Sequence, residues 1–348
     1  MKRILFTVSV LALTFAALNA CGNKKTEKSD SAQNNKQQTV QTQVCDTAIV
    51  YMTRNISPES LVRIYEALGV QAKGNVAVKI STGEGGNNNY LKPELIGQLV
   101  KKVNGTIVEC NTAYPGTRTT TADHWKTIKE HGFLKIAKVD IMDEEGDMHI
   151  PVADTTHMKY NIVGNHLKNY DFMINLAHFK GHAMGGFGGV LKNQSIGVAS
   201  SAGKLYIHTA GKYQEVAKMA EAWDYVDELP QDHFCESMAA AAQAVHNYFK
   251  KDGRNIVYID VMNNMSIDCD CDGKPSAPEI ADMGILASTD PVALDQVCVD
   301  LIFNLTNDKN NNTKPLIERI NKQHGLHTID HAAKIGLGTK VYKIVYID

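Results

Sequence analysis

The chain has 348 residues, with 36 lysines and arginines against 38 aspartates and glutamates, so its formal net charge is -2. The basic residues are interspersed with the acidic ones and form no basic stripe. Nucleic-acid-binding proteins concentrate positive charge on one face, so this balance argues against that class. We therefore expect no nucleic-acid partner.

The N-terminus has the order of a bacterial lipoprotein signal peptide. Lys2 and Arg3 precede an apolar run at residues 4–17, and Leu18-Asn19-Ala20-Cys21 ends it. This lipobox predicts cleavage before Cys21 and attachment of a diacylglycerol to its sulfur. An ordinary secretory signal or an uncleaved anchor is the alternative, but the apolar run is shorter than the ~20 residues of a membrane span. We expect a protein of the bacterial cell envelope, lipid-anchored to a membrane outside the cytoplasm.

Composition divides the rest of the chain in two. Residues 21–44 are rich in lysine, serine, asparagine, glutamine and threonine and have little to bury, so we expect a disordered tether there. Residues 45–348 are long enough for one large hydrophobic core or two moderate ones. The sequence thus predicts a signal peptide (1–20), a tether and a folded body.

The first part of the body alternates strands with helices. Apolar and β-branched runs predict strands at residues 49–53, 76–80, 106–109, 137–142 and 172–176. Capping residues, first-turn prolines and terminal glycines predict helices at residues 57–69, 93–103, 122–131 and 161–169. This alternation predicts an α/β fold with a mainly parallel sheet and helices on both faces.

The second part opens with a glycine-rich loop at residues 181–189, followed by a helical stretch at 213–251 that we expect to break near Leu229-Pro230. Asp290-Pro291 then caps a helix through Asn304. Further strands are predicted at residues 256–261, 283–287 and 341–346. One elaborated sheet and two lobes, at residues 45–175 and 176–348, fit this pattern equally well.

Two polar segments follow directly on predicted strands, where ligands bind in open α/β sheets. His178-Phe-Lys-Gly-His leads into a glycine loop and then Lys192-Asn193, while Lys79 ends a strand just before Glu84. Lysines there favour an anionic small molecule, and imidazoles can move a proton or bind a metal. We expect Glu84 to pair with Lys79. The glycine spacing supports neither a dinucleotide nor a P-loop nucleotide. A solvated loop and a structural ion pair are the alternatives.

These segments give the predicted site. The predicted catalytic residues are Lys79, His178, Lys180 and His182, and the predicted ligand-binding residues are Glu84, Gly186, Gly188, Lys192 and Asn193.

Cys269 and Cys271 are the two cysteines closest in sequence. An exported protein can form disulfides, but a Cys-x-Cys ring would be strained, so metal binding and redox chemistry compete with bridging. Together with His178 and His182 they are the predicted metal ligands, for zinc, iron or nickel. The segment 268–279 also matches the pattern of a calcium loop, although prolines stand where its exit helix should begin.

The combination of motifs resembles the family catalogued as domain of unknown function 362. The motifs that carry the resemblance are Ile49-Val-Tyr-Met-Thr, Val76-Ala-Val-Lys-Ile with Gly83-Glu84, His178-Phe-Lys-Gly-His, Gly186-Phe-Gly-Gly-Val-Leu-Lys-Asn, Asp268-Cys-Asp-Cys and Gly284-Ile-Leu-Ala-Ser-Thr-Asp-Pro-Val-Ala. Members are commonly described as uncharacterised iron-sulfur-centre proteins, which implies redox chemistry. The resemblance points to Lys79, His178, Lys180, His182, Lys192, Asn193, Cys269 and Cys271 as the site.

The chain departs from many members of that family. They carry a ferredoxin-like insert with repeated cysteines, whereas here the corresponding stretch after His208 has only Cys235. This argues against a ferredoxin-type cluster. The sequence is also similar at the level of the fold to the N-terminal domain of nickel-dependent lactate racemase, which implies a metal cofactor among histidines and lysines but assigns no reaction.

Two functions are compatible with these features. The first is a metal- or cofactor-dependent protein, with an oxidoreductase among the options. The alternative is a non-catalytic lipoprotein that binds an anionic small molecule. The sequence leaves open whether the protein is an enzyme, and a third interpretation takes Cys269 and Cys271 as a redox pair.

Overall fold

Eight strands from both parts of the body form one sheet in the computed structural model, which describes residues 47–348. Their order is β12 (Tyr342–Tyr346), β1 (Ala48–Thr53), β11 (Gly284–Ser288), β10 (Asn255–Met262), β7 (Phe172–His178), β2 (Val76–Lys79), β3 (Thr106–Glu109) and β4 (Val139–Ile141). Strand β11 runs antiparallel to β1 and β10, and the other neighbouring strands are parallel. The predicted mainly parallel α/β sheet is confirmed.

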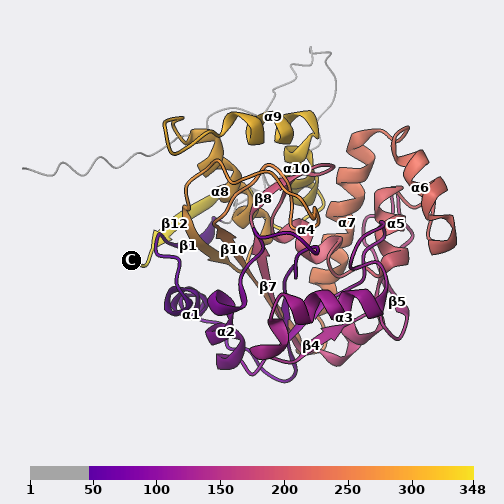
Figure 1. The fold of residues 1–348 in the computed structure, drawn as a ribbon, viewed down its shortest axis with the longest axis horizontal. Helices are drawn as coiled ribbons and strands as arrows, with labels where there is room; N and C mark the ends of the chain where they lie inside the picture. The colour runs from indigo at the N-terminus through magenta and orange to yellow at the C-terminus, as the bar shows by residue number, and fades with distance from the viewer. Residues whose placement is uncertain (1–46) are drawn as a thin grey trace, which may run out of the picture. The chain divides into compact units, whose positions relative to one another are not determined.

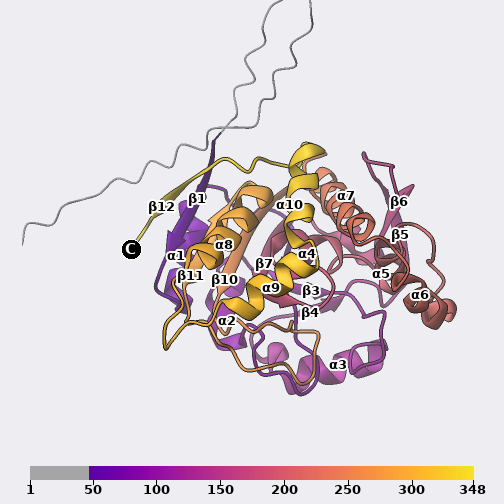
Figure 2. The same ribbon diagram turned by 90° about the horizontal axis from the view of Figure 1, so that it is seen from above.

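Helices cover both faces of this sheet, as predicted. One face packs against α1 (Pro58–Ala67), α2 (Pro93–Lys102) and α3 (Thr121–Glu130). The other packs against α4 (Val190–Ser195), α7 (Gln231–Phe249), α8 (Pro291–Asn304), α9 (Lys314–Lys322) and α10 (Gly325–Lys334). Figure 1 shows the first group below the strands and α8, α9 and α10 above them, and Figure 2 shows the same layers from another side.

The two faces follow from side-chain alternation along each strand. In β2, Val76 and Val78 belong to the core under α1 and α2, while Ala77 belongs to the core under α7 and α8. Successive residues of a strand point to opposite faces, so an uninterrupted apolar run predicts a strand buried on both sides. Two predicted helix N-caps are also confirmed. Ser57 and Asp290 accept hydrogen bonds from first-turn backbone amides of α1 and α8.

Smaller elements complete the body. Two hairpins join β5 (Asp147–Pro151) to β6 (Tyr160–Gly164) and β8 (Lys180–His182) to β9 (Gly186–Gly188), while α5 (Ser201–His208) and α6 (Met219–Val226) lie between α4 and α7 in the sequence. The three-residue 3-10 helices are Phe133–Lys135 and Val216–Lys218, and a longer one spans Asn165–Asn169.

Two helix predictions had different outcomes. The helix at 161–169 is wrong, because this segment is strand β6 followed by a 3-10 turn; Ile162 and Val163 are both buried, and β6 pairs with β5. The long helical stretch at 213–251 divides into α6 and α7, and the break at Leu229-Pro230 is confirmed.

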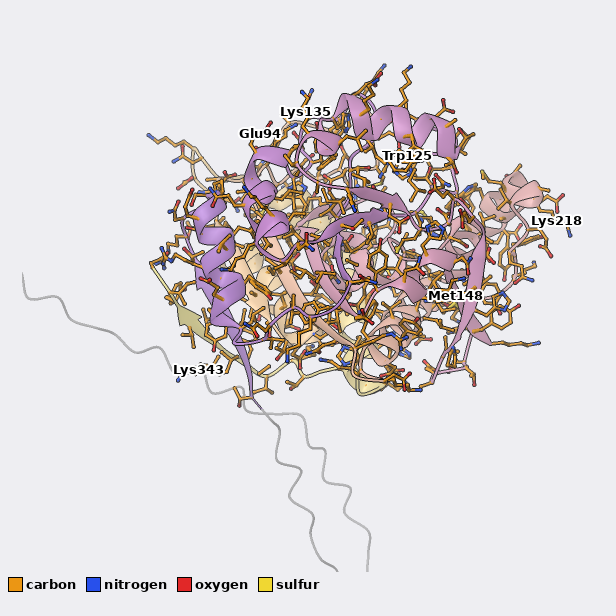
Figure 3. All side chains as sticks on the ribbon, turned by 90° about the horizontal axis from the view of Figure 1, so that it is seen from below. Glu94, Trp125, Lys135, Met148, Lys218 and Lys343 are labelled. Carbon is orange, nitrogen blue, oxygen red and sulfur yellow. A yellow bond between two sulfur atoms is a disulfide. The ribbon has the colours of Figure 1, made fainter. Side chains whose placement is uncertain are left out.

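The described residues belong to a single compact unit, and strands from both segments considered as lobes share its sheet. The signal peptide, Cys21 and the tether lie outside the described residues. Among helices within residues 47–348, none has the length and apolarity needed to cross a membrane. Charged side chains of both signs project around the surface, among them Glu94, Lys135, Lys218 and Lys343 (Figure 3).

Candidate functional site

The ends of four adjacent parallel strands define the site. Lys79 ends β2, Glu109 ends β3 and His178 ends β7, while β10 leads into the loop that carries Cys269 and Cys271. Because these strands are parallel neighbours, their carboxyl ends meet at one edge of the sheet. Segments that lie far apart in the sequence are thereby brought together.

A cavity of about 610 Å³ opens at this edge. The predicted site residues that line it are Lys79, Glu84, Lys180, His182, Gly188, Lys192, Asn193, Cys269 and Cys271. His178 and Gly186 do not line it. Lining residues outside the predicted catalytic, ligand-binding and metal-binding sets include Glu109, Tyr114, Arg118, Lys204, His208 and Asp270.

His178 is buried outside the cavity, which corrects its expected role as a catalytic group and metal ligand. Its Nδ1 lies 2.8 Å from Asp270 Oδ1 and its Nε2 lies 2.6 Å from the Asn263 carbonyl oxygen. Both ring nitrogens are therefore engaged by acceptors within the protein. His178 positions the loop that follows β10, because it holds Asp270 from the end of β7.

Asp270 has a second cationic neighbour. Lys180 Nζ lies 3.0 Å from Asp270 Oδ2 and donates to the His178 carbonyl oxygen at 2.7 Å. Burial raises the pKa of Asp270, but His178 and Lys180 outweigh it and hold that pKa well below its usual range. Lys180 is thus a paired cation at the cavity wall.

Gly186 has a structural role instead of the predicted ligand-binding one. Its φ is +79°, and a Cβ there would lie 3.0 Å from the Ile320 Cα and 3.1 Å from the Gly325 Cα. The position therefore requires glycine for a left-handed turn and for the close approach of α9 and α10.

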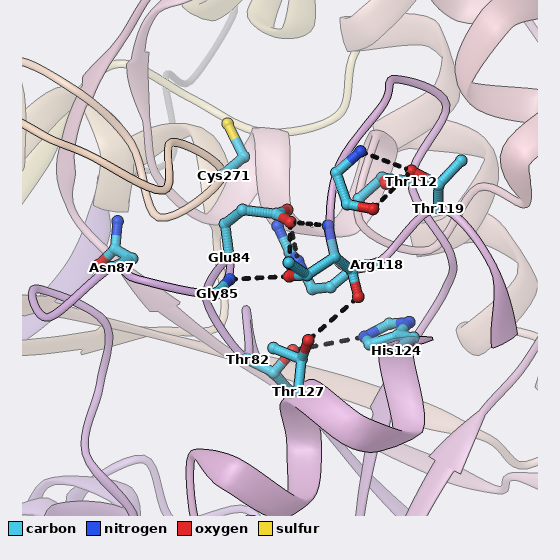
Figure 4. A network of polar contacts seen from close by, with 12 residues as sticks. Thr82, Glu84, Gly85, Asn87, Thr112, Arg118, Thr119, His124, Thr127 and Cys271 are labelled. Atoms are coloured by element: carbon cyan, nitrogen blue, oxygen red, sulfur yellow. Dashed lines mark hydrogen bonds and ion pairs between the residues drawn. The ribbon is translucent and has the colours of Figure 1, made fainter. Parts of the chain in front are cut away.

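Glu84 pairs with Arg118 and not with Lys79, contrary to the prediction. Arg118 Nε lies 3.2 Å from Glu84 Oε2, and its Nη1 lies 2.8 Å from Glu109 Oε1. Thr117 also donates its hydroxyl to Glu84. Figure 4 shows Glu84 next to Arg118. Arg118 lies in the loop after β3, and the strand-end rule that selected Lys79 would have drawn attention to that loop too.

Three further lysines of the cavity have no carboxylate partner within ion-pair distance in the described part of the chain: Lys79, Lys192 and Lys204. Lys79 Nζ donates to Asn193 Oδ1 at 3.1 Å, while Lys204 Nζ donates to a backbone carbonyl. Burial lowers the pKa of Lys79 to about 8 and that of Lys192 to about 7. Both amines can therefore exchange protons near neutral pH.

His182 presents a defined nitrogen. Its Nδ1 accepts hydrogen bonds from the backbone amides of Met184 (3.2 Å) and Gly185 (2.8 Å). Burial, together with the charge of Lys192, holds its pKa well below the usual value, so the ring is neutral. Since Nδ1 is the acceptor, the single ring proton is on Nε2.

Cys269 and Cys271 form a disulfide that lines the cavity. Both sulfurs and a ring nitrogen of His182 lie within 4.8 Å of one another, so the histidine and cysteine segments do meet. In this oxidised form neither sulfur is a thiolate, the form that binds metals. Figure 4 shows Cys271 on the loop beside Glu84.

The aspartates of this loop do not form a calcium site. Asp268 accepts from Ser276, Asp270 pairs with His178 and Lys180, and Asp272 accepts from the Lys274 amide. Each carboxylate has its own partner, and together they are not among the metal-ligand groupings of residues 47–348.

Comparisons place the chain among known proteins. The model of the family "Domain of unknown function (DUF362)" matches residues 76–300. No curated protein has a sequence that matches this one.

Solved structures resemble it distantly. A lactate racemase apoprotein from Thermoanaerobacterium thermosaccharolyticum matches with a TM-score of 0.40 and 14% identity over 72% of this chain and 56% of that one. A structural-genomics protein from Thermotoga maritima matches with a TM-score of 0.39 and 10% identity over 80% of this chain and 58% of that one. The chain thus spans little more than half the length of either protein. The family match covers well over half of the chain, and the protein therefore belongs to the DUF362 family.

Proposed function

We propose that the cavity binds an anionic small molecule and that its amines transfer protons to or from it. The observation that carries this proposal is a set of three cavity lysines for which residues 47–348 supply no carboxylate partner: Lys79, Lys192 and Lys204. A buried ammonium group is costly unless an anion compensates it. A ligand with a carboxylate or phosphate group supplies that anion.

Lys192 is the best placed of the three for proton transfer. Its Nζ has no hydrogen-bond partner within residues 47–348, and burial and the charge of Lys180 lower its pKa to about 7. A general acid or base is most effective when its pKa lies near the working pH. The Nε2 proton of His182 provides a neutral donor for the same ligand.

Ligand-dependent thermal stabilisation tests the binding. A panel of citrate, malate and inorganic phosphate should include a compound that raises the melting temperature of the wild type. The rise should disappear in Lys192→Met and persist in Lys135→Met, which removes an exposed lysine that does not line the cavity. Equal responses of the two variants would contradict the assignment. Turnover of the stabilising compound would then separate an enzyme from a binding protein.

A second candidate function is thiol–disulfide chemistry, favoured by the position of the disulfide in the cavity wall beside His182. An external dithiol would reduce the Cys269–Cys271 bond to two thiols while becoming a disulfide itself. Thiol titration before and after dithiothreitol should give two additional thiols in the wild type and none from this position in Cys269→Ser/Cys271→Ser. The same count in both proteins would exclude a reducible pair.

The reduced pair would also be the state that binds a metal in the cavity. Two thiolates and His182 make three ligands of the kind that zinc, iron and nickel accept. The protonated Nε2 of His182 opposes this unless the ring turns, because its Nδ1 already accepts two amides. Metal analysis of anaerobically reduced protein tests it, and an unchanged metal content in Cys269→Ser/Cys271→Ser would exclude the thiolates as ligands.

For the location, the lipobox at residues 18–21 supports attachment to a membrane of the cell envelope through Cys21. Cys21→Ser should lose incorporation of a labelled fatty acid and leave the membrane fraction. Retention of the label would refute the lipidation site.

A further inference from the structure

A second group of polar side chains lies outside the cavity, between α7 and α10. Glu236 lies on α7, and His327 and His331 lie four residues apart on α10. Residues four apart share one face of a helix, so both imidazoles face the same neighbour. One oxygen of Glu236, Oε1, lies 3.0 Å from His327 Nε2 and 3.6 Å from His331 Nδ1. None of the three lines the cavity.

His331 has a buried nitrogen without a partner. Its side chain is 5% exposed, and its Nδ1 makes no hydrogen bond within the described residues. Its Nε2 lies 2.7 Å from Asp154 Oδ2, an acceptor, so the neutral ring carries its proton on Nε2. The lone pair of Nδ1 then points toward the oxygen of Glu236 at a separation too long for a hydrogen bond. Two facing acceptors of this kind repel each other unless a proton or a metal ion lies between them.

The separations suit a transition metal. Zinc binds imidazole nitrogen and carboxylate oxygen at roughly 2.0–2.2 Å, which in a tetrahedral site puts neighbouring ligand atoms roughly 3.3–3.5 Å apart. The two observed separations, 3.0 Å and 3.6 Å, bracket that value. The 34% exposure of the His327 side chain leaves a fourth position open to water.

The surrounding groups have the arrangement that metal sites use. Asp154 accepts from His331 Nε2, as the outer carboxylate of a metal-bound histidine does. His157 Nε2 lies 2.6 Å from Glu236 Oε2, the oxygen that the proposed ion leaves free, and so orients that carboxylate. Both outer residues come from the segment between β5 and β6.

We propose that Glu236, His327 and His331 bind one divalent transition-metal ion, with zinc the best match, and that the ion fastens α10 to α7. His331 connects the same ion through Asp154 to the β5–β6 hairpin. The site is separate from the cavity, so it can be filled whether Cys269 and Cys271 are reduced or oxidised.

Zinc titration of the chelator-treated full chain, purified without a polyhistidine tag, tests the proposal. The experiment uses a Cys269→Ser/Cys271→Ser background to remove the cavity thiols, and competition with a chromogenic chelator to measure affinity. We expect one equivalent of zinc, with affinity lowered 10- to 100-fold or so in Asp154→Asn and by more than that in His327→Ala. Co²⁺ should give the visible absorption of a tetrahedral site, and His327→Ala should lose it.

His324→Asn is the matched control. His324 is exposed, lies at the start of the same helix and pairs with Asp232, and asparagine tolerates its φ of +48°. This variant should keep zinc affinity and the zinc-dependent rise in melting temperature. Absence of bound zinc in the parent protein, or equal affinities in His327→Ala, Glu236→Gln and His324→Asn, would overturn the site.

Discussion

Replacement of Arg118 by methionine tests the polar network in the cavity wall. Arg118, Glu84 and Glu109 are each at most 5% exposed, and the guanidinium contacts both carboxylates. Arg118→Met leaves two buried carboxylates without their cation. Breaking a buried ion pair in this way costs about 3–5 kcal/mol, because the remaining charges are neither solvated nor compensated.

The expected shift in melting temperature follows from the size of the body. Unfolding entropy is about 2.1 cal/mol/K per residue, so roughly 300 residues give about 0.6 kcal/mol/K. A loss of about 3–5 kcal/mol then lowers the melting temperature by about 5–8 °C. Thermal unfolding followed by circular dichroism measures this directly.

Arg54→Met is the control, because it replaces an arginine whose ion pair is exposed. Arg54 pairs with Asp348 at 3.8 Å, and their side chains are 68% and 38% exposed. An exposed pair contributes about 0–1 kcal/mol, so this variant should shift the melting temperature by less than about 2 °C. If Arg118→Met is no less stable than Arg54→Met, the buried network does not carry the stability assigned to it.

The pH dependence gives an independent check. Burial raises the pKa of Glu109, but Arg118 and His124 outweigh it and hold that pKa well below the usual value. The stability contributed by Glu109 is therefore present above its unfolded pKa and lost as the pH falls through the lower folded pKa. Without Arg118 the burial effect dominates and protonation relieves the uncompensated charge, so the defect of Arg118→Met should shrink as the pH is lowered. Adding Glu109→Gln should recover part of it.

Three further predictions concern stability alone, each measured by urea unfolding. Gly97→Ala should stabilise the protein by about 0.5–1 kcal/mol, because its Cβ meets Ile136 at an ordinary 3.5 Å within a helix; a loss of stability would contradict this. Gly181→Ala should destabilise it and shift the Cys269 loop, because a Cβ would lie 2.0 Å from the Ile267 carbonyl oxygen; an unchanged stability would be inconsistent with that contact. Burial raises the pKa of Asp295 and that of its neighbour Asp260, so the stability contributed by this pair should fall as the pH rises above the unfolded value of about 4; Asp295→Asn should lessen that fall.

The strand ends were predictable because they follow from local pattern. Continuous apolar runs identify strands buried on both faces, and the residue after each run must lie at the carboxyl edge. This rule places Lys79 and the His178 segment at the same edge and does not require the order of the strands. The order itself was not predictable, since the antiparallel β11 between β1 and β10 depends on packing between distant segments.

The sequence does not reveal which side chains of the site pair with one another. Glu84 lies five residues from Lys79, yet its cation is Arg118, in a loop that only the sheet brings near. His178 appeared equivalent to His182, but one imidazole is enclosed by Asp270 and Asn263 while the other faces the cavity. The helix expected at 161–169 failed for a related reason, because pairing with β5 and burial on both sides outweigh local helix signals.

Hydrogen-bond partners give His182 and His331 opposite chemical roles, which composition alone cannot reveal. His182 accepts amides at Nδ1, which leaves a proton on Nε2 and suits it to donate to an anion. His331 donates from Nε2 to Asp154, which leaves a lone pair on Nδ1 and suits it to bind a cation. The same type of side chain is thus suited to opposite partners. Replacement of His331 should therefore weaken metal binding, whereas replacement of His182 should weaken anion binding.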